Sequence, residues 1–432
     1  MKSIWQETIK IEYKPQLSGD IKTDVLIIGG GIAGVLCAHF LHEAGVDYIL
    51  VEGDRVGRGI TANTTAKITS QHGLIYQKLL KNEGIEKAKM YLKANQNAVS
   101  QYKKLCANID CDFEEKDAYV YSMDDRQAIE KEIAALHKIG FGAEFETETE
   151  LPFYIAGSVK FTKQAQFHPL KFISSISKNL NIYENTFIKE LAPRTAITDN
   201  GKITAEHIII ATHFPFLNKH GSYFLKMYQS RSYCIALENA PNLNGMYREE
   251  KQDGLSFRNY KDLLIIGGGG HRTGHKGDAW QELWEFAETA YPSARECYAW
   301  ATQDCMSLDS IPYIGRYSKQ AEGLYVATGF NKWGMTSSMV SAQILTDIIL
   351  GKKNEFAEVF SPQRNMIKPQ LFLNGITAVS NLFGATKPRC PHMGCALKWN
   401  NAERTWDCPC HGSRFEKNGK LINNPATGDL PS

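Results

Sequence analysis

Long hydrophobic runs are missing from this sequence. No stretch of about 18 apolar residues occurs, so no membrane-spanning helix is expected. The first residues, Met1 to Thr8, contain no apolar signal core, and we expect a cytoplasmic protein. No basic tract stands out and the net charge is +2, which argues against nucleic-acid and membrane partners. The 432 residues, 43% hydrophobic and 22% charged, have the composition of an ordinary globular protein of two or three domains.

The groups needed for hydrolysis are also missing, because no nucleophile triad or carboxylate pair stands out. Cysteine shows no pairing pattern over most of the chain. Six of the ten cysteines are scattered, and we expect buried or inert thiols at Cys37, Cys106, Cys111, Cys234, Cys297 and Cys305. The other four lie after residue 385, where their spacing carries information.

Two short loops near the C-terminus combine cysteine with histidine. Cys390-Pro-His392 is followed by Cys408-Pro-Cys-His411. Two thiolates on one iron and two imidazoles on the other are the ligands of a Rieske [2Fe-2S] cluster. Zinc is the alternative, but zinc loops usually place two to four residues between paired ligands, and the first pair here has one. We therefore predict Cys390, His392, Cys408 and His411 as metal ligands.

The segments 390–395 and 408–413 resemble the cluster loops of Rieske proteins in respiratory cytochrome complexes. The resemblance implies a small β domain at 386–432, trimmed of its first strands, with 423–428 as the loop that covers the cluster. Cys395 and Cys410 are predicted to form a disulfide, although this would be unusual in the cytosol. Ser413 is expected to donate a hydrogen bond to a bridging sulfide, and exposed histidine ligands to contact a redox partner.

The N-terminal region has the pattern of a dinucleotide-binding fold. An apolar strand, 23–28, runs into Gly29-Gly-Gly-Ile-Ala-Gly34, a helix follows to Glu43, and a second strand, 48–51, closes on Glu52. Glycines in such a turn let the backbone approach a pyrophosphate at the helix N-terminus, and the acid accepts hydrogen bonds from the ribose. The sequence therefore predicts a bound dinucleotide.

FAD is favoured over NAD by later segments. The polar stretch 59–67 can lie along an extended dinucleotide, although a threonine-rich surface turn is the alternative. A helix starting near Met335 would direct its N-terminal amides at the flavin. The predicted FAD-binding residues are Gly29, Gly31, Ile32, Ala33, Gly34, Glu52, Gly53, Thr61, Asn63, Thr64, Thr65, Ala66, Ile188, Ala211, Thr212, Gly329, Gly334, Met335 and Thr336.

Residues 20–355 resemble the FAD-dependent oxidoreductases of the D-amino-acid oxidase superfamily, which includes glycine and sarcosine oxidases. The resemblance rests on the glycine motif with Glu52, on segments 186–191, 211–212, 308–315 and 327–336, and on their order. Ile188 occupies the position of the adenine-contacting valine of that family. The whole chain resembles bacterial fusions of such an oxidoreductase with a Rieske domain. The resemblance implies a substrate with an oxidisable C–N bond, an amine or amino acid.

We expect an α/β fold with a Rossmann-like FAD-binding domain and an antiparallel-sheet substrate domain, followed by the small β domain. The predicted boundaries are the oxidoreductase at 1–360, with FAD-binding segments at about 20–90, 160–215 and 320–355 and substrate segments at about 91–160 and 216–319, and a helical connector at 361–385. Long helices are predicted over 85–106, 280–291 and 370–383.

The remaining expectation concerns the catalytic residues. Arg258, His271 and Lys332 are the chosen candidates, since the family often binds a carboxylate through arginine, but each also fits an ordinary structural role. Further candidates are Arg272, His213 and Lys67. The leading hypothesis is a dehydrogenase that passes electrons from FAD to the cluster and then to a one-electron redox partner. The alternatives are an electron carrier or redox sensor without substrate turnover, and an amine oxidase with a zinc-bound tail.

Overall fold

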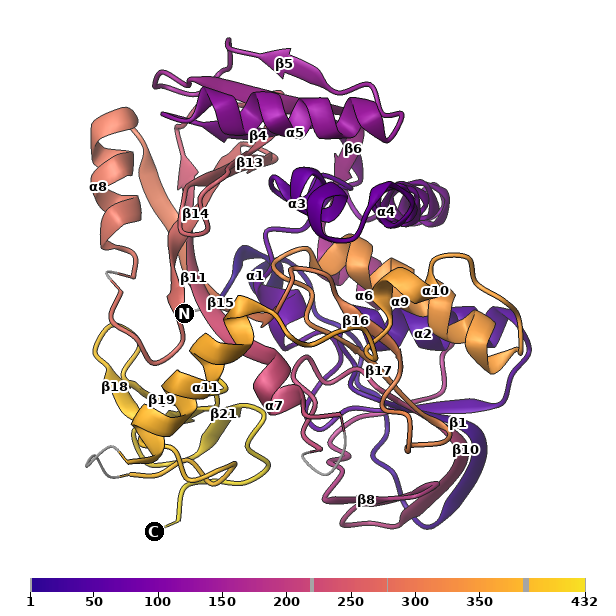
Figure 1. Ribbon diagram of the computed structural model, residues 1–432. Helices are drawn as coiled ribbons and strands as arrows, with labels where there is room; N and C mark the ends of the chain where they lie inside the picture. Colours follow the sequence, from indigo (N-terminus) through magenta and orange to yellow (C-terminus); the bar gives the residue numbers. More distant parts are fainter. Residues whose placement is uncertain (1, 218–220, 278, 384–387, 432) are drawn as a thin grey trace.

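The computed structural model describes residues 2–217, 221–277, 279–383 and 388–431, and it contains three β-sheets (Figure 1). The mixture of parallel and antiparallel sheets with covering helices confirms the predicted α/β class. Among the described helices, none combines the length and apolar character needed to cross a membrane. The predicted helices over 85–106, 280–291 and 370–383 are present within a residue of the expected bounds.

The first sheet is parallel at its centre and carries the glycine motif. All four residues of β1 from Val25 to Ile28 are at most 5% exposed, which explains the continuous apolar run in the sequence. The strand order is β16-β17-β10-β1-β2-β7, with β8 and β9 attached to β10. The strands are β1 (Ile21–Ile28), β2 (Tyr48–Val51), β7 (Ile182–Tyr183), β8 (Glu190–Ala192), β9 (Thr195–Ile197), β10 (Lys202–Ile210), β16 (Tyr313–Arg316) and β17 (Leu324–Thr328).

The second sheet is antiparallel except where β12 pairs with β4. Its order is β15-β11-β14-β13-β12-β4-β6-β3, and β5 pairs with β6. The strands are β3 (Lys67–Ile68), β4 (Glu114–Ser122), β5 (Glu144–Glu146), β6 (Gly157–Gln166), β11 (Met227–Glu238), β12 (Gly245–Glu249), β13 (Ser256–Tyr260), β14 (Leu263–Arg272) and β15 (Arg295–Ser307).

Helices pack around these two sheets. α2 begins within the glycine motif and packs against α9, and both helices are largely buried. The helices are α1 (Ile4–Thr8), α2 (Ile32–Glu43), the 3₁₀ turn η1 (Ile60–Asn63), α3 (Ile75–Asn82), α4 (Ile85–Cys106), α5 (Arg126–Lys138), α6 (Pro169–Ile176), α7 (Tyr223–Lys226), α8 (Gln281–Ala290), α9 (Gly334–Ile349), α10 (Ala357–Phe360) and α11 (Pro369–Leu382).

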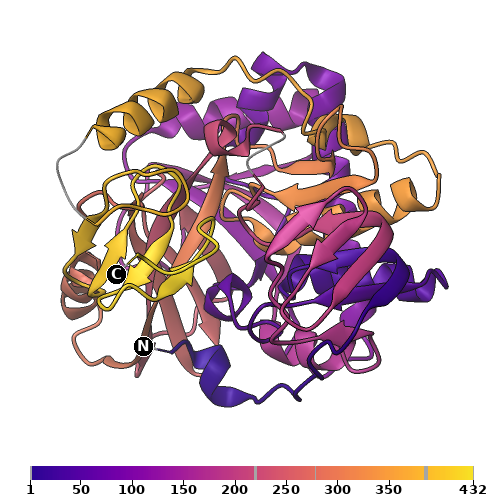
Figure 2. The ribbon, with the colours of Figure 1, turned by 90° about the horizontal axis from the view of Figure 1, so that it is seen from below.

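Residues 388–431, called the C-terminal unit below, form a third sheet of four short antiparallel strands. The strands are β18 (Lys398–Asn400), β19 (Thr405–Asp407), β20 (Arg414–Glu416) and β21 (Leu421–Asn423). The buried cluster of this unit consists of four cysteines with Leu397, Phe415 and Ala426. So small a core gives little stability by itself, and the unit lies against α11 and the lower end of the second sheet in both views (Figures 1 and 2).

A buried ion-pair network attaches the C-terminal unit to β11. Arg231 makes a two-pronged contact with Glu403, with Nε–Oε1 and Nη2–Oε2 distances of 3.0 and 2.5 Å. Arg414 binds the same carboxylate at 2.8 Å and also Asp407 at 3.0 Å. Burial acts to raise the pKa of Glu403, but the two arginines outweigh it and the pKa is lowered. The carboxylate is therefore held ionised between two cations from different parts of the chain.

Side chains of the second sheet also bind backbone carbonyls of the C-terminal unit. The donor–acceptor pairs are Gln229 Nε2 to His411 O (2.7 Å), Gln303 Nε2 to Gly412 O (2.8 Å), Arg272 Nε to Pro409 O (3.1 Å) and Arg272 Nη2 to Cys410 O (3.1 Å). In the opposite direction, Asn424 donates to the carbonyls of Thr212 and Phe214 at 2.6 and 2.7 Å. The second predicted ligand loop is thus fixed against the rest of the chain.

The close approach of α2 to β1 requires glycine at position 34. A Cβ on Gly34 would lie 1.9 Å from the Gly29 carbonyl oxygen, and backbone cannot move aside easily. We expect Gly34→Ala to cost about 1–3 kcal/mol of stability and to lower the bound dinucleotide per chain. Gly142→Ala is the control, since its Cβ would meet no described atom within 4 Å. Thermal unfolding and cofactor absorbance measure both effects; an unchanged Gly34→Ala protein would contradict this packing.

Glu403→Gln should weaken the attachment of the C-terminal unit. The two arginines would lose their anion, at a cost of about 3 kcal/mol near neutral pH. Because the folded pKa of Glu403 is lowered, the stabilisation is complete above the unfolded value of about 4.3 and is lost as pH falls through the folded value. Denaturation of both proteins at several pH values measures this.

The control is Glu416→Gln, since Glu416 is exposed. Hydrogen exchange over residues 388–431 reports whether this unit loosens first. Equal stability of Glu403→Gln and wild type at pH 7 would rule out the proposed role of the network.

Candidate active site and metal centre

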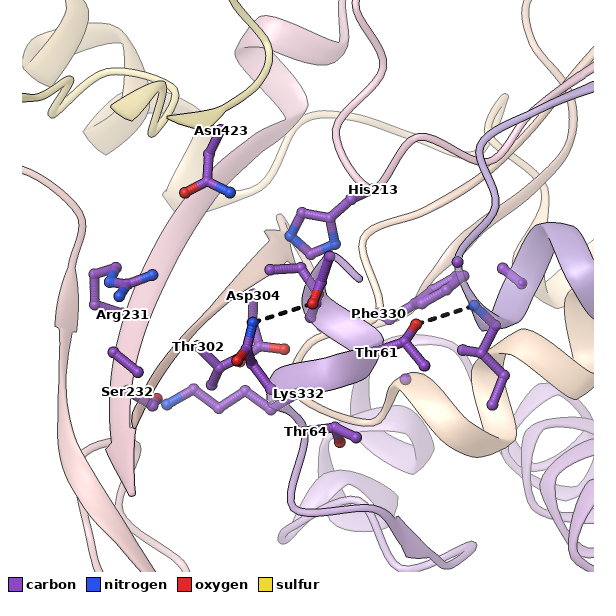
Figure 3. A pocket seen from close by; sticks show the side chains of 18 of the residues that line it. Thr61, Thr64, His213, Arg231, Ser232, Thr302, Asp304, Phe330, Lys332 and Asn423 are labelled. Atoms are coloured by element: carbon purple, nitrogen blue, oxygen red, sulfur yellow. Dashed lines mark hydrogen bonds between the residues drawn. The ribbon is translucent and has the colours of Figure 1, made fainter. Parts of the chain in front are cut away.

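One large cavity lies where the three sheets meet. Its volume is about 1940 Å³, larger than the roughly 300–1,000 Å³ of common ligand pockets. The lining runs from Gly29 through Lys332 to Asn423 and Asn424 of the C-terminal unit. Figure 3 shows side chains from all three regions around this space. The cavity has room for a dinucleotide and a second molecule together.

The glycine motif forms a backbone cradle at one end of the cavity. Gly29 has a φ of +112°, and a Cβ there would lie 2.6 Å from the Ala211 carbonyl oxygen. Gly31 caps α2, and the amide of Ile32 donates to Thr61 Oγ1 at 3.0 Å. The N-terminus of α2 faces the cavity beside the Thr61 hydroxyl, and the absence of Cβ atoms at Gly29 and Gly31 permits the close backbone approach that a pyrophosphate site requires.

Glu52 ends β2 beside this cradle. Its two carboxylate oxygens accept the amides of Gly30 at 2.6 Å and Asp54 at 2.9 Å. Burial raises the pKa of Glu52, and the two amide hydrogen bonds reduce that rise. The side chain lines the cavity in an orientation fixed by backbone, which suits a group that receives ribose hydroxyls.

Most of the predicted FAD-binding residues line this one cavity. The residues in the lining are Gly29, Gly31, Ile32, Ala33, Glu52, Gly53, Thr61, Asn63, Thr64, Thr65, Ile188, Ala211, Thr212, Gly334 and Met335. Gly34, Ala66, Gly329 and Thr336 lie behind it. Thr336 instead hydrogen-bonds His72 and the Thr69 carbonyl, at 2.9 and 3.1 Å, so it positions a neighbouring loop. The cradle fits a flavin dinucleotide, while the individual contacts stay predictions.

Arg258 does not reach the cavity. It is 1% exposed, and Nη1 donates to the carbonyls of Thr65 and Ala66 at 2.7 and 3.1 Å. Its guanidinium lies 5.4 Å from the centre of the Trp5 ring. The structure thus places Arg258 behind the 59–67 segment, where it holds that segment from the far side.

The other two catalytic candidates differ in their position relative to the cavity. His271 stacks on Tyr233, with ring centres 5.7 Å apart, and is outside the lining of the cavity. Lys332 is within the lining, and its Nζ donates to the Gln252 carbonyl at 3.0 Å. Burial lowers the pKa of Lys332 to about 8. Of the three candidates, only Lys332 is in a position to touch a ligand in this cavity.

Two charged residues near Lys332 were not predicted from the sequence. Arg248 lines the cavity and donates to the carbonyls of Lys251 and Gln252, at 3.0 and 2.8 Å. Asp304 also lines it, and burial raises the pKa of that carboxyl. Each lies within an ordinary β-strand without a motif, so only the fold brings them together. With Lys67, whose Nζ donates to the Tyr247 carbonyl at 2.7 Å, they make this end of the cavity strongly polar.

His213 lies between this polar end and the C-terminal unit (Figure 3). Burial lowers its pKa to about 4, although hydrogen bonds to the Gln303 backbone and the Gln229 side chain oppose the shift. The ring is therefore neutral at pH 7. Its Nε2 is buried and has no hydrogen-bond partner among the described residues.

The two predicted ligand loops have matching backbone geometry. In the first, the amides of Cys390 and Gly394 bond to the carbonyls of Cys395 and Cys390 at 2.9 and 2.8 Å. In the second, Cys408 and Gly412 bond to Ser413 and Cys408 at 2.8 and 2.9 Å. The loops face each other, and the rings of their two histidines are 4.9 Å apart at 86°. Both loops therefore present their side chains to one shared space.

The donor atoms in this space fit the predicted cluster. His411 is 3% exposed, and its Nδ1 has no hydrogen-bond partner within the part of the chain that the structure describes. The Sγ atoms of Cys395, Cys408 and Cys410 lie within 4.8 Å of one another. Three thiols alone would suit a different metal, but the facing imidazoles and the unpartnered nitrogen favour a set of two thiolates and two imidazoles.

Two expectations about this centre differ from the structure. The predicted Cys395–Cys410 disulfide is absent from the structure, in which both residues are free cysteines whose Sγ atoms lie within 4.8 Å of each other. Of the two histidines that were expected to be exposed, only one has an exposed surface. His392 is partly exposed, whereas His411 is turned inward against Phe214 and Phe224, with ring centres 6.2 Å away. The cause is the docking of the C-terminal unit on the rest of the chain.

Ser413 lies beside the predicted ligands. Its hydroxyl accepts the amide of Ala426 at 3.0 Å and also hydrogen-bonds the Cys390 side chain. The covering loop around Asn424 is thereby tied to the second ligand loop. This arrangement supports a role for Ser413 in tuning the centre, which stays a prediction.

Comparisons with known proteins agree with both sites. Residues 24–348 match the family described as FAD dependent oxidoreductase, and residues 352–432 match the Rieske [2Fe-2S] domain. A protein of Bacillus subtilis (strain 168), provisionally named Rieske 2Fe-2S iron-sulfur protein YhfW, is 32% identical, with 99% of this chain and 96% of that protein covered.

Two solved structures share the fold of the larger part. Glycine oxidase from Geobacillus kaustophilus has a TM-score of 0.68 at 18% identity, covering 80% of this chain and 99% of its own. L-proline dehydrogenase from P. horikoshii has a TM-score of 0.67 at 17% identity, covering 81% and 98%. The chain belongs to the FAD-dependent oxidoreductase family and carries a C-terminal Rieske [2Fe-2S] domain.

Proposed function

We propose that this protein is a dehydrogenase that oxidises a C–N bond of an amine or amino acid and passes the electrons through its Rieske centre to a separate redox partner. One observation carries the proposal: a single cavity joins the FAD cradle, a polar ligand region and the C-terminal unit. The fold shared with a glycine oxidase and a proline dehydrogenase supports a C–N substrate. A built-in one-electron acceptor makes a direct reaction with dioxygen unnecessary.

The polar end of the cavity supplies groups that suit an amino acid. Lys332 and Arg248 are cations that can bind a carboxylate, and Asp304 offers a site for the amine. His213 is neutral, and its buried Nε2, which binds no described residue, is a candidate to take up or pass on a proton. When bound, FAD accepts a two-electron hydride equivalent, whereas a [2Fe-2S] cluster carries single electrons.

The route between the two centres would run through the docked loops. Gln229 contacts His213 on one side and donates to the carbonyl of His411 on the other. Because His411 is turned inward, one of the two proposed histidine ligands lies toward the flavin domain. The other member, His392, is partly exposed and is the side on which an external partner could approach.

A second candidate function is an electron carrier or redox sensor that turns over no small molecule. The position of Arg258 favours it, because the arginine expected to bind a carboxylate lies outside the cavity. Arg248 and Lys332 argue for a substrate. The two functions differ in whether any amine or amino acid reduces the flavin.

The first test is spectroscopic. We expect anaerobically purified protein to show flavin absorbance, with two irons and two acid-labile sulfides per chain. Reduction with dithionite should give an EPR signal typical of mixed histidine and cysteine ligation. Cys408→Ser should abolish the signal and keep the flavin, whereas Cys297→Ser, at an exposed cysteine, should change neither. Zinc in place of iron would refute the electron route and leave a flavoenzyme.

The second test concerns the substrate. We expect an amino acid to bleach the flavin of the holoprotein, and Lys332→Gln to raise its KM about 10- to 100-fold by removing a charged hydrogen bond. Because the pKa of Lys332 is about 8, wild-type KM should rise above pH 8 as the cation is lost. Steady-state kinetics with an artificial acceptor measure this.

Lys353→Gln, at an exposed lysine, is the control. A primary amine without a carboxylate should be insensitive to Lys332→Gln. If dithionite reduces the flavin but no amine or amino acid does, the dehydrogenase is excluded and the carrier function is favoured.

A further inference from the structure

Helix α11 buries a polar side and exposes an apolar side, which is the reverse of an ordinary amphipathic helix. Its sequence, residues 369–382, contains no charged side chain. The polar side faces the protein: Asn374 is 4% exposed, accepts Arg272 Nη1 at 3.0 Å and donates to the Leu225 carbonyl at 3.1 Å. The carbonyl of Asn381 accepts the amide of Ala396 at 2.9 Å. A surface helix normally buries its apolar side instead.

The apolar side of α11 faces solvent. Its exposed side chains, with that of the residue after its end, recur at helical spacing and define what we call the outer face of α11: Phe372 (64% exposed), Leu373 (54%), Ile376 (66%), Val379 (56%), Leu382 (42%) and Phe383 (86%). Ile367, just before the helix, is 72% exposed. Exposed apolar residues are ordinary when single, but a contiguous patch marks an interaction site. Figure 2 shows α11 at the edge of the molecule.

The charged side chains of the segment that carries this face all have one sign. From residue 359 to residue 402 the sequence contains five basic residues and no acidic one. The basic residues are Arg364, Lys368, Lys387, Arg389 and Lys398, of which Lys387 lies outside the described residues. Arg364 and Lys368 pair with acids from elsewhere, while Lys398 is exposed. An anionic surface would meet no acidic side chain of this segment.

The outer face of α11 continues to the first ligand loop. Arg389 Nη1 donates to the carbonyls of Leu382 and Gly394, at 2.7 and 3.1 Å, and so ties the end of the helix to that loop. Met393 within the loop is 38% exposed. The partly exposed His392 therefore lies at the end of the apolar face.

We propose that the outer face of α11 docks this protein on an anionic lipid bilayer, with the helix lying in the plane of the interface. Protein interfaces carry about one hydrogen bond per 100–200 Å² and a polar rim, whereas the exposed side chains of α11 are apolar except for Ser380. Aromatic and aliphatic groups on one side with basic residues nearby are the features of an interfacial helix. Such a helix does not cross the membrane, so the lack of a spanning helix among the described residues is compatible. The sequence predicted no membrane partner, and this proposal replaces that expectation with binding at the membrane surface.

The test is flotation of the holoprotein with phosphatidylcholine vesicles, with and without phosphatidylglycerol. We expect flotation that increases with the anionic lipid and weakens with salt. The double variant Phe372→Ser/Ile376→Ser should lower vesicle partitioning at least about tenfold, because two side chains lose their burial in lipid. The control is Tyr154→Ser, which removes a side chain that is 80% exposed on another part of the surface.

Flavin absorbance and thermal unfolding establish that each variant is folded. Absence of flotation in the folded wild type, at any vesicle composition, overturns the proposal. So does flotation that the double variant leaves unchanged. A dimer that forms without lipid and is dissociated by the double variant would assign the face to a second copy of the chain. These outcomes are independent of the substrate and of the cluster.

Discussion

The attachment of the C-terminal unit depends on one carboxylate held between two arginines. Glu403 belongs to the small unit, Arg231 belongs to β11, and Arg414 returns from the small unit to the same oxygen. Three buried ions are costly to remove from water, and the geometry compensates through paired, charge-assisted hydrogen bonds. A unit whose core is largely four cysteines and a few apolar residues needs such an anchor.

The same attachment determines which residues surround the proposed cluster ligands and the cavity. It turns His411 inward against Phe214 and Phe224, and leaves His392 toward the outside. It also closes the cavity on one side, since Asn423 and Asn424 are part of its lining. The lining of the cavity that contains Lys332 therefore comes from three separate parts of the chain.

Local pattern in the sequence predicted local structure well. α4 was expected over 85–106 and has these bounds, because its apolar residues recur at helical spacing between Gly84 and a polar turn. The glycine motif and the two ligand loops are similarly short-range, since their function depends on backbone shape within a few residues. The domain boundaries and individual site contacts remain predictions.

Contacts between distant segments were beyond the sequence. Arg258 reads as a strand residue that could face a ligand, yet the fold puts the carbonyls of Thr65 and Ala66 in front of it. Arg248 and Asp304 lie on separate strands with no motif, and nothing local shows that they share a cavity. Cys395 and Cys410 are free in the structure, although the loops bring their Sγ atoms within 4.8 Å of each other.

The contact between Gly412 and Gln229 has a kinetic consequence. A Cβ at Gly412 would lie 2.5 Å from Gln229 Cβ, so the ligand loop is in direct contact with β11 and needs no encounter to reach it. In the proposed function, exchange of electrons between a flavin and a cluster held in this way would be a first-order process. Its rate would be set by a fixed separation, independent of dilution and of viscosity, whereas delivery to an external acceptor would remain second-order.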